Sequence, residues 1–146
     1  MIYNRPVKMG GEFGRMANLG NAILIIGFGI MTWRTGILRK FEEHRKWAIR
    51  TFIVVSGVWF FRIGFGTWFL LSGFTAPGVA EDLTGCFDKF LYVGSYLVPL
   101  IVAEAYLRTK ASTSPSQKKV MAIFLYLLIP LLIGGTLVTV KVFWLA

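Results

Sequence analysis

The sequence predicts an all-α, polytopic membrane protein, a single domain built as a bundle of four transmembrane helices. Its composition, its long apolar windows and the placement of its basic residues each point to this class. Of the 146 residues, 55% are hydrophobic and 16% are charged, whereas about 25% of the residues in a soluble domain are charged. The mean hydropathy is +0.64. A chain with so few polar residues cannot cover a soluble core, and we expect the lipid bilayer to be its solvent.

Four apolar windows are long enough to cross a bilayer. A helix needs about 20 mostly apolar residues to span a hydrocarbon core about 30 Å thick. The windows that meet this requirement are residues 16–33, 48–72, 87–107 and 120–145. The first is rich in glycine and carries Asn18 and Asn21 near its start. We therefore expect part of this helix to pack against protein rather than lipid.

Local signals bound the later helices. An Ala-Pro-Gly turn at residues 76–78 ends the second window, and Ser-Pro-Ser at residues 114–116 separates the third from the fourth. A proline inside a helix leaves the carbonyl oxygen four residues earlier without its usual partner. Pro99 and Pro130 therefore free the carbonyls of Ser95 and Tyr126.

The basic residues predict the orientation of the bundle. Ten of the sixteen Lys and Arg residues lie in residues 34–50 and 108–119, whereas the connection between the second and third windows carries Glu81, Asp82 and Asp88. Cytoplasmic loops retain positive charge, so we expect both chain termini on the non-cytoplasmic side. The basic N-terminal tail does not fit this pattern, but the loop charges outweigh it. The net charge of +9 then reflects membrane orientation, and we expect no nucleic-acid partner.

Arg62 is the most informative single residue. It lies about eleven residues, or roughly 16 Å, from the cytoplasmic end of its window, which places it near the bilayer midplane. A charge at that depth needs partners. We expect Arg62 to donate to the freed carbonyls of Ser95 or Tyr126, with Tyr96 or Asn21 helping. Such a cluster could bind an anionic or carbonyl-bearing lipophilic ligand; alternatively, Arg62 only fastens the bundle.

Glu104 predicts a contact between two helices. It lies one turn before Arg108, at the cytoplasmic end of the third window, and level with Arg50 at the start of the second. We expect an interfacial ion pair between Arg50 and Glu104, because such pairs are commoner than proton relays in membrane proteins. The alternative is a proton-carrying role for Glu104 together with His44.

The remaining polar residues suggest neither a metal site nor catalysis. His44 is the sole histidine and Cys86 the sole cysteine, whereas a six-coordinate b-type haem needs two axial ligands and a thiolate cluster needs several cysteines. We therefore expect no cofactor. The sequence contains none of the common nucleophile, zinc or phosphate-binding motifs, so an enzyme is not the expected class. Arg45, Lys46 and Trp47 are expected to contact lipid headgroups.

Three segments carry a family resemblance. The runs HRKWAIR, WFFRIG and YLVPLIVAEAYLR resemble a family of predicted bacterial membrane proteins, domain of unknown function twenty-three oh six. The match covers roughly residues 16–110 and corresponds to the C-terminal part of the family pattern, since family members usually have two further helices upstream with another histidine. The resemblance implies a multi-pass protein of the bacterial inner membrane and brings no activity. The residues that carry it are His44, Arg45, Trp47, Arg50, Arg62, Pro99, Glu104 and Arg108.

These observations favour a non-catalytic membrane module. The leading interpretation is a scaffold, a subunit of a larger complex or a binder of a lipophilic ligand near Arg62, and the chain could also form a homo-oligomer. A b-type haem electron-transfer subunit is the first alternative. A small transporter or channel component is the second, and it predicts a wet cavity that reaches Arg62.

Overall fold

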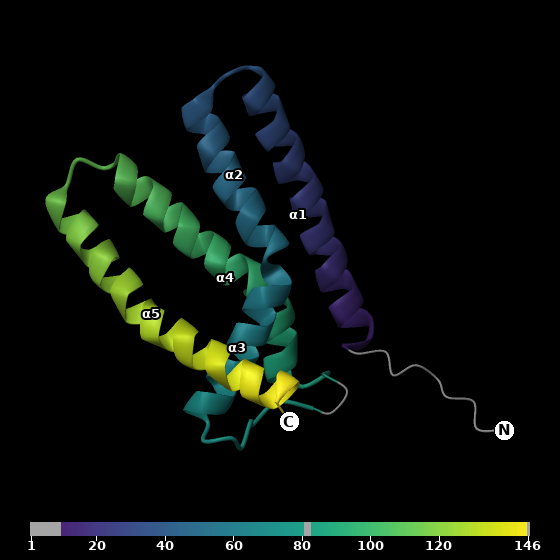
Figure 1. Ribbon diagram of the computed structural model, residues 1–146. Coiled ribbons are helices and arrows are strands. Elements are labelled where there is room, and N and C mark those ends of the chain that lie inside the picture. The colour runs from purple at the N-terminus through teal and green to yellow at the C-terminus, as the bar shows by residue number, and fades with distance from the viewer. Residues whose placement is uncertain (1–9, 81–82, 146) are drawn as a thin grey trace.

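α-Helices are the regular secondary structure of the described part of the chain, as the sequence predicts. The computed structural model describes residues 10–80 and 83–145, and within these residues the chain forms five helices and no strand (Figure 1). Glu81 and Asp82, two of the acidic residues used above to predict orientation, lie outside the described residues, as does the tail before residue 10. The helices are α1 (Gly11–Ile37), α2 (Phe41–Val55), α3 (Gly57–Leu71), α4 (Cys86–Ala111) and α5 (Pro115–Trp144).

The lengths and apolarity of these helices match three or four membrane spans. Helices α1 and α4, and residues 115–142 of α5, are each long and apolar enough to cross a bilayer. Helices α2 and α3 meet the same criterion only when they are taken together. α5 begins five residues before the predicted window, at Pro115, because proline is favoured in the first turn, where its missing N–H would have no helical partner.

The second predicted helix, residues 48–72, is broken into two. α2 and α3 meet at an angle of 57°, and Ser56 separates them. Sharp bends occur at Gly/Ser pairs, and here Gly57 is buried against other helices. A Cβ atom at Gly57 would lie 3.3 Å from Nδ2 of Asn21 and 3.6 Å from Cβ of Tyr96. Side chains of α1 and α4 thus approach the backbone of α3 closely at this glycine, next to the bend.

Small residues bring α3 and α5 together. α5 packs chiefly against α3, and α1 packs chiefly against α2. Gly66 of α3 and Gly135 of α5 are both buried, and a Cβ atom at Gly66 would collide with the carbonyl oxygen of Gly135 and the hydroxyl of Thr139. The Thr139 hydroxyl lies 2.8 Å from the carbonyl oxygens of both Arg62 and Gly135. Such close backbone contacts are typical of helix packing in membranes.

α1, the bent pair α2–α3, α4 and α5 run in alternating directions, so the connections gather at two ends. The α1–α2 and α4–α5 connections lie at one end of the bundle, and the α3–α4 connection lies at the other end with the start of α1 and the end of α5 (Figure 1). The first end carries the basic connections of the sequence. We refer to it below as the basic end, defined by residues 34–50 and 108–119.

Candidate functional site

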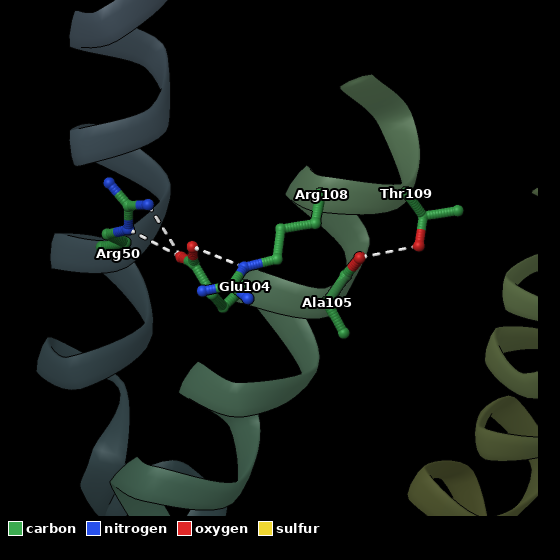
Figure 2. A network of polar contacts seen from close by, with 5 residues as sticks. All are labelled: Arg50, Glu104, Ala105, Arg108 and Thr109. Atoms are coloured by element: carbon green, nitrogen blue, oxygen red, sulfur yellow. Dashed lines mark hydrogen bonds and ion pairs between the residues drawn. The ribbon is translucent and has the colours of Figure 1, made fainter. Parts of the chain in front are cut away.

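An ion-pair network joins α2 to α4 near the basic end. Nη2 and Nε of Arg50 lie 2.7 Å and 3.1 Å from Oε2 of Glu104. Nε of Arg108 lies 3.4 Å from the other carboxylate oxygen, Oε1 (Figure 2). The Arg50 side chain is 20% exposed, whereas that of Arg108 is 81% exposed. Exposed ion pairs contribute little, so the Arg50–Glu104 contact dominates, and it is the pair expected from the sequence.

An aromatic ring also supports Arg50. The guanidinium carbon of Arg50 lies 4.8 Å from the centroid of the Trp47 ring, within the range of a cation–π interaction. The Trp47 ring in turn packs against Phe28 of α1, with ring centroids 5.5 Å apart. Arg50 is therefore held between an aromatic ring on its own helix and a carboxylate on α4. Trp47, expected as a headgroup anchor, packs inside the α1–α2 contact.

A second set of polar contacts joins α1 to α2. Nδ1 of His44 lies 2.8 Å from the carbonyl oxygen of Thr32. A carbonyl only accepts hydrogen bonds, so Nδ1 carries the proton and donates it. The hydroxyls of Thr32 and Thr51 lie 2.8 Å apart. Sequence reasoning missed these contacts, although threonines within otherwise apolar helices were a usable signal because a buried hydroxyl needs a partner.

The structure does not assemble the cluster expected around Arg62. Its side chain is exposed, and no hydrogen bond joins its guanidinium to any residue within 10–80 or 83–145. The Ser95 hydroxyl donates instead to the Tyr92 carbonyl at 3.3 Å, and Tyr126 is 74% exposed. The physical reason is the bend at Ser56, because the expected depth of Arg62 assumed one straight helix from residue 48 to residue 72.

Two members of the expected cluster do come together, at the bend. Asn21 of α1 and Tyr96 of α4 both face Gly57. Oδ1 of Asn21 is buried and has no hydrogen-bond partner within the described residues. Asn21 and Tyr96 therefore belong to the packing around the bend, and neither contacts Arg62 through a hydrogen bond in the part of the chain that the structure describes.

Asp88 organises the opposite end of the bundle. Its side chain is fully buried, and Oδ2 accepts the backbone N–H groups of Ala80 at 2.9 Å and Gly85 at 3.0 Å. It thereby fixes the α3–α4 connection onto the start of α4. Sequence reasoning treated Asp88 only as a loop charge. The usable signal was an acidic residue three positions after a helix-starting glycine, as in a capping box.

Two basic residues of α2, Arg45 and Lys46, are exposed near the basic end. Arg45 makes a long contact of 3.9 Å with Glu42. Cations of this kind attract anionic lipids when they lie at a membrane surface. Their headgroup role stays a prediction.

Comparisons with models of protein families, with curated proteins and with solved structures found no match to this chain. The resemblance described from the sequence thus stays a prediction, and the function has to be argued from the geometry.

Proposed function

We propose that this protein is an integral membrane protein with four spans that serves as a non-catalytic scaffold or subunit of a membrane assembly. The spans are α1, the bent pair α2–α3, α4 and α5. The observation that carries the proposal is the set of hydrogen bonds between helices: within the described residues, side chains of α1 and α2, of α2 and α4, and of α5 with the backbone of α3 are joined in this way.

The outward faces of the helices support insertion into a bilayer. Ile23 and Ile26 of α1 are 70% and 63% exposed, and Leu127 and Leu137 of α5 are 68% and 64% exposed. Leaving such a side chain in water instead of burying it costs about 1.5–3 kcal/mol. Lipid removes that cost for every one of these residues.

The polar contacts favour a scaffold over a ligand binder. Arg50 and Glu104 join α2 to α4, Thr32 contacts α2 through two partners, and Thr139 joins α5 to α3. The side chain of Arg62 is exposed on α3, although its backbone carbonyl accepts the Thr139 hydroxyl of α5. An arginine that faces lipid costs from about 2.5 to above 10 kcal/mol, so a protein partner that covers Arg62 would stabilise the complex. A lipophilic ligand would have to bind from the outside.

Orientation and compartment are part of the proposal. The basic end faces the cytoplasm and both termini face the opposite side, in a bacterial inner membrane. The positive-inside pattern supports the orientation, and the resemblance stated from the sequence supports the compartment.

Cys86 provides the test of orientation. It is exposed at the start of α4 and is the sole cysteine. A membrane-impermeant maleimide added to sealed cells should label it without permeabilisation. The matched control is the double variant Cys86→Ser, Thr113→Cys, which moves the thiol to the α4–α5 connection; this thiol should react only after permeabilisation. The reverse labelling pattern would overturn the orientation, and recovery of the chain in solution without detergent would overturn insertion.

Arg62 provides the test of the subunit role. In a mild detergent, the natively expressed chain should migrate on a native gel as a species several times heavier than the chain itself. Arg62→Leu should shift it toward the monomer, whereas Arg34→Leu, which removes an exposed arginine at the end of α1, should not. A wild-type chain that migrates only as a monomer would contradict a subunit role.

A further inference from the structure

We propose that the groove between the last turns of α4 and the first turns of α5 binds an anionic phospholipid, with the phosphate at Lys110 and Lys118 and one acyl chain along α5. This inference rests on the proposed insertion into a bilayer. The groove has a volume of about 310 Å³, at the lower end of the range for small-molecule sites. It therefore holds one segment of a lipid, and the rest of the molecule stays in the bilayer.

The lining of the groove divides into a charged mouth and an apolar floor. Lys110 lies in the last turn of α4 and Lys118 in the first turn of α5, and both line the groove and are exposed. The floor follows α5 away from the basic end through Met121, Ala122 and Leu125. A phospholipid has the same order of chemistry, a charged phosphate followed by hydrocarbon, and enters a bundle from the headgroup level.

Among residues 10–80 and 83–145, neither Lys110 nor Lys118 forms an ion pair with an acidic side chain. No acidic residue follows Glu104 in the sequence, and Glu104 is already bound by Arg50 and Arg108. Figure 2 shows Thr109, which lines the groove, on the side of α4 opposite Arg50. The Glu104 carboxylate thus belongs to the other face of α4, and the two lysines favour an anion.

Recognition then depends on the two lysines. The Thr109 hydroxyl donates to the Ala105 carbonyl at 2.8 Å, so its proton is already used within α4. A lysine ammonium carries three donors and suits phosphate as a point charge. Each basic residue near an anionic membrane surface contributes on the order of 1 kcal/mol, or about fivefold in affinity.

Native mass spectrometry of the full chain, released from detergent, tests the inference. The probes are dioleoyl phosphatidylglycerol, dioleoyl phosphatidylcholine and inorganic phosphate. We expect phosphatidylglycerol to bind more tightly than phosphatidylcholine, and Lys110→Gln and Lys118→Gln to weaken phosphatidylglycerol about fivefold each. The matched control, Lys40→Gln with Lys119→Gln, removes two charges from the same end outside the groove and should retain the preference. Ala122→Trp keeps every charge but fills the floor, and should also weaken lipid binding.

Each of several results would overturn the inference. Equal binding of phosphatidylglycerol and phosphatidylcholine would overturn it. So would a control variant that loses as much affinity for phosphatidylglycerol as the groove variants do, because the lipid would then respond to the total charge and not to the groove. If inorganic phosphate occupied the groove as tightly as phosphatidylglycerol does, the acyl chain would add nothing to binding, and the proposed contact along α5 would be refuted. A chain that inserts into detergent and vesicles without lipid preference contradicts only this inference, whereas a chain that needs no detergent contradicts the proposed membrane insertion itself.

Discussion

Replacing Gly66 by alanine should separate α3 from α5. The added Cβ atom would collide with the backbone carbonyl oxygen of Gly135, which cannot rotate away, and with the hydroxyl of Thr139. Overpacking of this kind costs about 1–3 kcal/mol. Moving the helices apart also breaks the 2.8 Å contact of Thr139 with the Arg62 carbonyl, worth about 0.6 kcal/mol in a membrane protein.

The expected net destabilisation is about 2.5 kcal/mol. The upper end of the overpacking range applies because the obstructing atom is backbone, and the better helix propensity of alanine returns about 1 kcal/mol. Gly27→Ala is the matched control, since a Cβ atom at Gly27 meets nothing within 4 Å. That variant should leave stability unchanged or raise it by up to about 1 kcal/mol.

Unfolding of the detergent-solubilised chain by increasing sodium dodecyl sulfate, followed by tryptophan fluorescence, measures both variants. The two free energies of unfolding should differ by about 3 kcal/mol. Crosslinking between α3 and α5 should fall for Gly66→Ala and stay constant for Gly27→Ala. If Gly66→Ala were as stable as the wild type, the close contact at Gly66 and Gly135 would not hold the two helices together, and the reasoning would fail.

Three further predictions follow from the polar contacts. Glu104→Gln should lower the free energy of unfolding by about 1 kcal/mol, because it leaves half-buried Arg50 without its anion. The control Glu43→Gln should leave the free energy of unfolding unchanged. A double-mutant cycle between residues 50 and 104 that returns no interaction energy would refute this. Asp88→Ala removes the acceptor of two backbone N–H groups and should speed proteolysis of the 76–85 connection about tenfold; an unchanged rate would mean that other contacts fix the connection. Protein expressed with added haem should lack Soret absorption, because a six-coordinate b-type haem needs two axial ligands and His44 is the sole histidine of the sequence; an absorption lost in His44→Ala would favour the electron-transfer alternative.

The sequence predicted the helical class and the approximate positions of the long apolar helices because those depend on local composition, whereas several helix ends differ from the predicted windows by four to seven residues. Long apolar windows and the turns at residues 76–78 and 114–116 are readable without any tertiary information. The pairing of Arg50 with Glu104 was also accessible. Both residues lie near basic connections, and alternating helix directions bring those connections to the same end.

The bend and its consequences could not be read from the window of residues 48–72. At the bend, Gly57 packs against Asn21 and Tyr96, and those partners come from helices distant in sequence. The predicted position of Arg62 came from counting residues along one straight helix. In the structure the helix axis turns by 57° before Arg62, and the side chain is exposed. Buried Asp88 was missed for a related reason: its two N–H donors belong to Ala80 and Gly85, whose positions depend on the folded connection.

The bend at Ser56 is also the point about which α3 would rotate relative to α2. α2 is attached to α1 and α4 by side-chain hydrogen bonds, whereas α3 packs against α5 at the glycine contact and against α4 through the ring pairs Phe61–Tyr92 and Trp68–Phe87. A helix of 15 residues is about 22 Å long, so a rotation of about 10° at its base displaces its far end by about 4 Å. Such a rotation would carry α5 with it and displace the rings of α3 from those of α4, while the Arg50–Glu104 ion pair between α2 and α4 stayed in place.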